Sequence, residues 1–171
     1  LGGLAVKAAK DADELNTLAK PTGVATDELQ KMQYASGLID VDTETIIGGL
    51  RKLKKNLDGH EESWQKIGVN VKNANGEYKD ITTIFYDTIK GLSGIANETE
   101  RDKVAMDLFG KSADELAGVI DDGGAALKAL GEDAENLGVI IPQEDIDKAN
   151  ELNDTLDRLK AEILPTITRL G

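Results

Sequence analysis

The chain has 171 residues, 40% of them hydrophobic and 4% aromatic, and its net charge is −12. Without cysteine and with a single histidine, His60, it has neither a disulfide framework nor the ligands of a cysteine-type or two-histidine zinc site. The surplus of acids disfavours binding to nucleic-acid phosphates, and the aliphatic composition favours an all-α chain, a multi-helix array.

Helical spacing of apolar residues dominates the first third of the chain. A helix is predicted over residues 4–19, where Pro21 ends it because proline lacks an amide donor, and Gly23 marks a turn. Thr26 is predicted to cap a second helix that runs to Ile39.

Asp42 is placed to cap the next predicted helix. Apolar residues recur in it at spacings of four, three and four, which is typical of one buried face: Ile46, Leu50, Leu53 and Leu57. The other side is basic and is either a solvated surface or a contact for an acidic partner: Arg51, Lys52, Lys54 and Lys55.

Between Ile67 and Asp80 the period of apolar residues changes to two. Val69 and Val71 alternate with polar residues, and the dipeptide Asn75-Gly76 is a strong turn signal because both residue types tolerate positive φ. We expect a short β-hairpin or an extended loop near residues 68–79.

Two further helices are predicted from their start signals. Asp80 is expected to cap a helix over residues 81–92, and Asn97 with Glu100 has the spacing of a capping box for a helix that ends at Phe109.

A helix-junction motif follows, made of Phe109, Gly110, Ser112 and Glu115. Gly110 stops one helix, and Ser112 with Glu115 repeats the capping-box spacing and predicts a short helix to Ile120. We expect Phe109 to anchor this junction in the core. Another helix is predicted over residues 125–137.

The last predicted helix begins after Pro142 and is the longest. Its apolar residues alternate spacings of three and four, which indicates either the start of a coiled-coil-like rod or an ordinary core helix: Ala149, Leu152, Leu156, Leu159 and Ile163, continued past Pro165 by Thr166 and Leu170. Four of them form the predicted self-association or partner face: Leu152, Leu156, Leu159 and Ile163. Residues 1–111 hold 18 acids and 15 bases, whereas residues 112–171 hold 14 acids and 5 bases.

Residues that could carry chemistry do not form a recognisable set. The Gly-Lys-Ser string at Gly110 lacks the first glycine of a phosphate-binding loop, since Ala105 stands there. A calcium loop over residues 71–82 would begin at Val71 and end at Thr82, and neither is a carboxylate. We expect no catalytic, cofactor-binding or metal-binding residue and no membrane span.

The predicted organisation has two parts. Residues 1–141 form a punctuated helical domain, and residues 142–171 begin a long helical rod. Both chain ends are expected to be cuts within a longer protein, since the chain opens without methionine and ends within the apolar repeat.

Several ordered strings resemble the tail tape measure proteins of long-tailed bacteriophages and prophages. They cover about residues 8–161 and comprise Thr22-Gly23, Leu29-Gln30, Tyr34-Ala35, Asp40-Val41, Gly68-Val69, Ala74-Asn75-Gly76, Asn97-Glu98-Thr99-Glu100-Arg101-Asp102 and Leu108-Phe109-Gly110-Lys111-Ser112-Ala113. The Phe-Gly-Lys-Ser-Ala string after a helix, followed by Glu-Leu, is the most specific part.

This resemblance implies a helical structural protein rather than an enzyme. Its length would set how far the tail tube polymerises, and it would occupy the tube lumen until DNA ejection. The implied partners are the tail tube protein, tail assembly chaperones and tail tip or baseplate proteins, with no sequence-specific nucleic acid. The implied locations are the virion tail and, during assembly, the host cytoplasm.

Two other classes of function stay open. One is a helical binding or adapter module, for instance chaperone-like, that shares only the helix punctuation. The other is a muramidase-type hydrolase that uses an acid such as Glu115.

Overall fold

The computed structural model describes residues 10–170 except 12 and 19, with side chains to residue 163. The described residues form helices and loops without a strand, which confirms the all-α prediction for this part of the chain. Of the helix predicted over residues 4–19, residues 10–11 and 13–18 are helical, and the rest lies outside the described residues.

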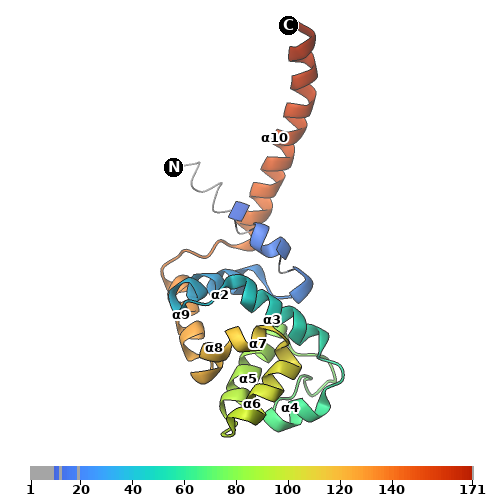
Figure 1. Ribbon diagram of the computed structural model, residues 1–171. Coiled ribbons are helices and arrows are strands. Elements are labelled where there is room, and N and C mark those ends of the chain that lie inside the picture. The colour runs from blue at the N-terminus through green and yellow to red at the C-terminus, as the bar shows by residue number, and fades with distance from the viewer. Residues whose placement is uncertain (1–9, 12, 19, 171) are drawn as a thin grey trace.

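The helices pack into a body from which the last helix projects (Figure 1). In Figure 1, α2 and α9 lie side by side next to the projecting helix, and α4, α5 and α6 lie at the far end of the body. The elements are η1 (Lys20–Thr22), α2 (Thr26–Ile39), α3 (Thr43–Lys55), α4 (Glu61–Ile67), α5 (Ile81–Ser93), α6 (Glu98–Phe109), α7 (Ser112–Glu115), α8 (Ala117–Asp121), α9 (Ala125–Asn136) and α10 (Gln143–Leu170).

The core is aliphatic with a small aromatic centre. The predicted stripe of α3 is buried, except that Leu57 lies beyond the helix end and is only partly buried. Phe85 of α5 meets Phe109 of α6 edge to face, with ring centroids 5.9 Å apart. The other large, fully buried side chains belong to the same core cluster: Leu29, Met32, Ile46, Leu50, Leu53, Ile84, Ile89, Leu92, Leu108 and Leu116.

Helices α2 and α9 approach closely because small residues line their contact. Ala35 of α2 and Ala134 of α9 are fully buried. A Cβ added at Gly131 would lie 3.1 Å from the Cβ of Lys31. The Lys31 ammonium closes the edge of this contact by pairing with Glu28 and Glu135, each at 3.1 Å.

The predicted caps Asp80 and Asn97 are confirmed, Asp42 is the N-cap residue of α3 but its side chain makes no capping hydrogen bond, and the predicted cap Thr26 is wrong. The Asp80 carboxylate accepts from the Thr83 amide, and the Asn97 side chain accepts from the Glu100 amide, both at 3.0 Å. The N-cap of α2 is Ala25, not Thr26. Thr26 is buried, and its hydroxyl donates instead to the Asn16 side chain at 2.8 Å, because a buried hydroxyl needs a partner.

The predicted capping box at Ser112 is also wrong. Lys111 already has helical dihedrals (φ −60°, ψ −25°), so Ser112 lies inside the first turn and caps nothing. The Glu115 carboxylate accepts a hydrogen bond from the Thr45 hydroxyl of α3. The single helix predicted to Ile120 is split into α7 and α8 around Leu116, which is fully buried.

Of the two alternatives predicted near residues 68–79, the structure forms the loop and not the β-hairpin. Residues 68–80 are a loop with one isolated antiparallel bridge, between Lys72 and Tyr78, and no strand. The Asn73 side chain accepts hydrogen bonds from the amides of Asn75 and Glu77 at 3.0 and 3.2 Å, and these bonds stabilise the turn locally. Only Gly76 of the turn dipeptide takes positive φ, at 82°.

Helix α10 has 28 residues, which corresponds to about 42 Å at 1.5 Å per residue, and its backbone continues through Pro165. Two hydrogen bonds hold the chain just before it: the Gln30 side chain donates to the Ile141 carbonyl at 2.9 Å and accepts from its amide at 2.8 Å. Ile146 is fully buried at the base of the helix. The division into domains at residue 141 stays a prediction.

Candidate functional site

The junction residues lie at a close contact between helices. Phe109 has an exposed fraction of 1%. A Cβ added at Gly49 of α3 would lie 3.4 Å from Phe109 Cδ1 and 3.0 Å from Leu116 Cδ1, so this side of α3 must be bare for the junction to pack. Gly110 reverses the chain with φ 63°. The geometry is that of a packing joint.

The other two residues of the predicted junction motif, Ser112 and Glu115, lie on α7 and contact α3. The Ser112 hydroxyl oxygen would lie 3.1 Å from a Cβ at Gly48, so Ser112 also packs on α3. Glu115 is exposed and tied to Thr45. These contacts join α7 to α3, and a glycosidase acid would instead need an apolar pocket that raises its pKa.

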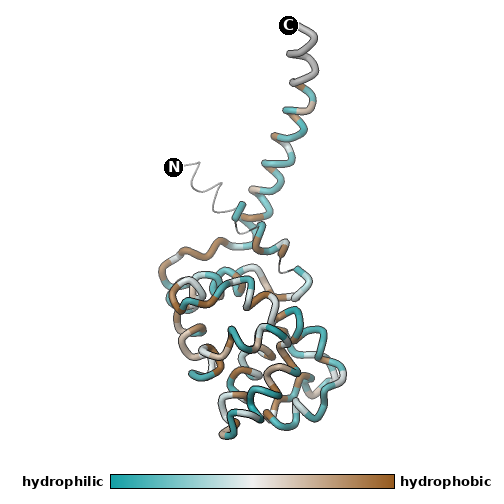
Figure 2. The backbone as a smooth tube through the Cα atoms, viewed as in Figure 1, coloured by the Kyte–Doolittle hydropathy of each residue, from teal (hydrophilic) through white to brown (hydrophobic). Residues whose placement is uncertain are grey.

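The four apolar residues of the predicted face of α10 are exposed. Their exposed fractions lie between 44% and 53%: Leu152, Leu156, Leu159 and Ile163. Figure 2 shows α10 as a largely hydrophilic helix with isolated apolar positions, in contrast to the body. A polar helix with one narrow apolar seam is the pattern of a coiled-coil strand.

His60, Ser63 and Asp107 have the residue types of a nucleophilic triad but not its geometry. The Asp107 carboxylate accepts from the Ser63 hydroxyl at 2.5 Å and lies 2.9 Å from His60 Nδ1. In a triad the serine bonds to the histidine, whereas here both meet the same carboxylate oxygen. Burial alone would raise the pKa of Asp107, but these two hydrogen bonds, together with the charge interactions with His60 and Lys52, lower the pKa overall. The cluster fastens α4 to α6.

Two other kinds of site are absent from the described residues. No group of three or more histidine, aspartate or glutamate side chains there could hold a metal ion. Within the same part of the chain, no helix is both long and apolar enough to span a membrane.

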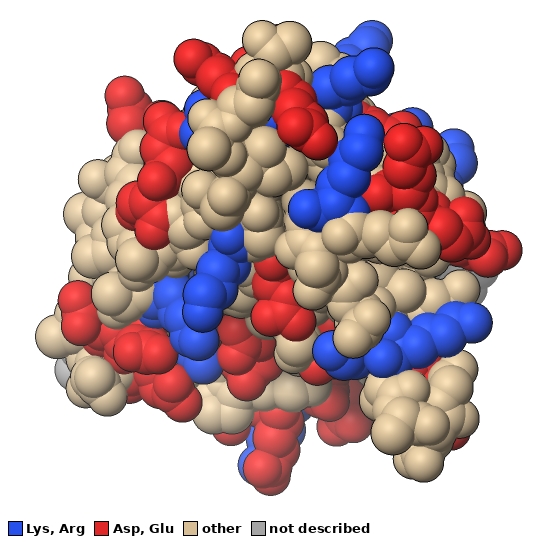
Figure 3. All heavy atoms as spheres, turned by 90° about the horizontal axis from the view of Figure 1, so that it is seen from below, with Lys and Arg blue, Asp and Glu red and all other residues tan. Residues whose placement is uncertain are grey.

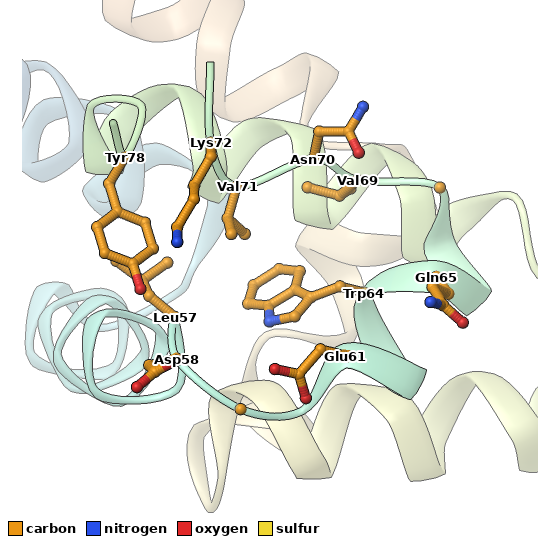
Figure 4. A pocket seen from close by; sticks show the side chains of 12 residues that line it. Leu57, Asp58, Glu61, Trp64, Gln65, Val69, Asn70, Val71, Lys72 and Tyr78 are labelled. Carbon is orange, nitrogen blue, oxygen red and sulfur yellow. The ribbon is translucent and has the colours of Figure 1, made fainter. Parts of the chain in front are cut away.

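A cavity with an apolar floor lies between α4 and the loop that follows it (Figure 4). Its volume is about 450 Å³, within the range of about 300–1,000 Å³ usual for small-molecule sites. We call it the Trp64 cavity. Its lining residues are Leu57, Asp58, Gly59, Glu61, Trp64, Gln65, Gly68, Val69, Asn70, Val71, Lys72 and Tyr78.

The floor of the Trp64 cavity is apolar and held in place. The Trp64 ring is 5% exposed, and its Nε1–H donates to the Asn56 carbonyl at 3.3 Å. Leu57, Val69 and Val71 are partly buried against the core beside it.

The rim of the cavity is polar and carries both signs of charge. Lys72 Nζ lies 5.0 Å from the centre of the Tyr78 ring, a cation–π contact, and the ring is 44% exposed. Asp58 and Glu61 lie on the opposite side, as Figure 4 shows. Across this described cavity no ion pair within 4.0 Å joins Lys72 to either carboxylate. The charged groups therefore stay available to a ligand.

None of these cavity residues was predicted as a site. They come from three short polar stretches: the turn after α3, helix α4 and the loop over residues 68–78. In the comparisons with known proteins no family model matches the chain, and no curated protein or solved structure is significantly similar to it.

Proposed function

We propose that this chain is a structural assembly protein rather than an enzyme, a helical body that carries a rod. Within that class, we propose that it is a segment of a phage tail tape measure protein. One observation carries the proposal: α10 leaves the packed body as a polar helix with an exposed apolar seam (Figures 1 and 2). The ordered sequence strings that resemble tail tape measure proteins support the choice of this family.

The size of α10 suits a ruler. Its length of about 42 Å compares with a radius of gyration of about 15 Å expected for a compact chain of 171 residues. In a tape measure protein, a helix that rises about 1.5 Å per residue would make the length of the tail proportional to the number of residues in the rod. The apolar seam would bind a second copy or an assembly chaperone, and the outer surface would face the tail tube protein, with tail tip or baseplate proteins at the end.

The decisive experiment changes the length of the rod. One or three tandem copies of residues 143–163, which are whole multiples of the seven-residue repeat, would be inserted after residue 163 of the encoding gene. As helix, these insertions add about 32 and 95 Å. Electron microscopy of the resulting virions should show tails lengthened in that one-to-three proportion.

Two results would contradict the proposal. Tails of unchanged length, with the inserted protein present in the virion, would exclude a ruler. Release of soluble fragments from peptidoglycan by the chain, lost in Glu115→Gln, would favour a hydrolase. The unmodified chain carried through the same purification is the control for virion assembly.

A helical adapter is the second candidate, favoured by the exposed seam of α10. An adapter would bind a partner helix through the seam but would not scale any length. Tails of constant length, together with stable capture of a tail assembly chaperone by the chain and its loss in Leu156→Glu, would favour the adapter.

A further inference from the structure

From its lining, we infer that the Trp64 cavity binds a neutral sugar unit of an oligosaccharide. The inference is independent of the role proposed for α10, because the cavity lies at α4 and the adjoining loop, within the body (Figures 1 and 4). It would add a recognition site to a chain proposed above as a structural element.

The charges on the rim select against charged ligands. A cation attracted to Asp58 and Glu61 meets the ammonium of Lys72, and an anion attracted to Lys72 meets both carboxylates. A zwitterion could face both signs, but ion pairs at exposed side chains contribute only about 0–1 kcal/mol each. A charged ligand therefore gains little.

Hydroxyl groups satisfy both sides of the rim at once. A sugar hydroxyl donates one hydrogen bond and accepts others, so one ring can accept from Lys72 and donate to Glu61. Gln65 and Asn70 add amide groups that donate and accept on the same rim. A ligand rich in hydroxyls uses every polar group without bringing a net charge.

The apolar surfaces of the cavity suit the C–H face of a sugar ring. The Tyr78 ring is nearly half exposed, and the face of an aromatic ring is electron-rich. Trp64 and Val71 supply the floor. The walls are open at Gly59 and Gly68, since a Cβ at either position would meet nothing within 4 Å.

Figure 3 bears on the alternative of a polyanion as the ligand. On the face that it shows, lysine and arginine side chains are interspersed with acids and do not form a continuous basic surface. A nucleic-acid strand needs a basic track to follow, and this face offers none.

The sole tryptophan of the chain makes the inference directly testable. Because Trp64 lies on the cavity floor, its fluorescence responds to a ligand bound there, and circular dichroism recorded alongside shows whether the fold as a whole has changed. The full chain would be titrated with cellobiose, maltose and N,N′-diacetylchitobiose as neutral probes. Trilysine, inorganic phosphate and glycylglycine would serve as the cationic, anionic and zwitterionic probes.

Saturable binding of at least one disaccharide is expected, with a Kd in the millimolar range or below. Glu61→Gln and Tyr78→Ala should each weaken it at least tenfold, whereas Tyr78→Phe keeps the ring and should stay within about threefold. Glu151→Gln, on the exposed side of α10, is the matched control and should not change it. Circular dichroism would verify that each variant folds.

The inference is overturned by any of three outcomes. One is the absence of a saturable response to all three disaccharides up to 50 mM. Another is saturable binding of trilysine, phosphate or glycylglycine alone. The third is disaccharide binding that Glu61→Gln leaves unchanged, a result that can be read even if Tyr78→Ala unfolds the loop, because Glu61 is exposed.

Discussion

A methyl group added at Gly91 should destabilise the protein, although alanine forms helices better than glycine. Gly91 lies within α5, and a Cβ there would be 2.6 Å from the Ile67 carbonyl oxygen and 2.9 Å from the Ile67 Cβ. An ordinary C···O contact is about 3.3 Å. The end of α4 must therefore move away from α5 by about 0.7 Å, and a backbone carbonyl cannot rotate away as a side chain can.

The magnitude follows from two opposing effects. Overpacking costs up to about 3 kcal/mol when backbone has to move, and the gain in helix propensity from glycine to alanine is about 1 kcal/mol. We expect Gly91→Ala to lower the free energy of unfolding by about 2 kcal/mol. The matched control is Gly37→Ala in α2, where a Cβ meets nothing within 4 Å; it should raise the free energy by about 0.5–1 kcal/mol.

Urea denaturation followed by circular dichroism, with Trp64 fluorescence as a second probe, measures both variants. A Gly91→Ala protein as stable as the unmodified chain, measured alongside a stabilised Gly37→Ala, would refute the reasoning. It would mean that α4 is not held against α5 tightly enough for the contact to matter.

Three further predictions concern the core, a helix cap and the rod. Phe109→Ala should lower the free energy of unfolding, measured by urea denaturation, by about 3–5 kcal/mol, since the Phe109 ring is buried against Phe85. A decrease below about 1 kcal/mol would show that the ring faces solvent. Asp80→Ala should cost about 1 kcal/mol at pH 7. The Thr83 hydroxyl also donates to Asp80 Oδ1, at 2.6 Å, and this bond is the main cause that lowers the pKa of Asp80 below its ordinary 3.8, so the carboxylate stabilises the fold above that value. The difference from Asp80→Ala should therefore shrink as the pH falls below 3.8; a constant difference down to pH 2 would contradict this cause. The full chain should self-associate in sedimentation experiments, and Leu156→Glu should abolish the association. Ala161→Glu, which adds the same charge outside the apolar seam, should leave the association unchanged. An unmodified chain that is monomeric would contradict the proposed role of the seam.

Local signals were the predictable part of the fold. Asp80 and Asn97 cap their helices as predicted because a cap involves only residues two or three positions along the chain. The buried stripe of α3 was predictable for the same reason, since a helix places residues three and four apart on one face.

The predictions failed where distant residues compete for a local group. Glu115 has the right spacing for a capping box, but Thr45, 70 residues away, donates to its carboxylate. The period-two pattern at Val69 and Val71 predicts a hairpin or an extended loop, and the hairpin alternative is wrong, since the two valines lie on one side of a loop that packs against the core. In both cases the local pattern exists in the sequence, but the contacts that decide the structure are made with residues far away along the chain.

Helix α4 and the Trp64 cavity could not be derived from the sequence alone. Helix α4 has seven residues, of which only Trp64 and Ile67 are buried, so its apolar period spans a single turn. The cavity forms only when the turn before α4 and the loop after it fold back around Trp64.

The paired hydrogen bonds between Gln30 and Ile141 have a mechanical consequence. A pull along α10 is resisted first by the hydrogen bond that the Asn150 side chain donates to Asp13 at 2.9 Å and by the buried Ile146, and it then reaches the body through the Gln30–Ile141 pair. These few contacts, loaded one after another, would yield before the many core contacts of α3, α5 and α6. The rod would thus separate from the body at this junction under tension while the body stays folded.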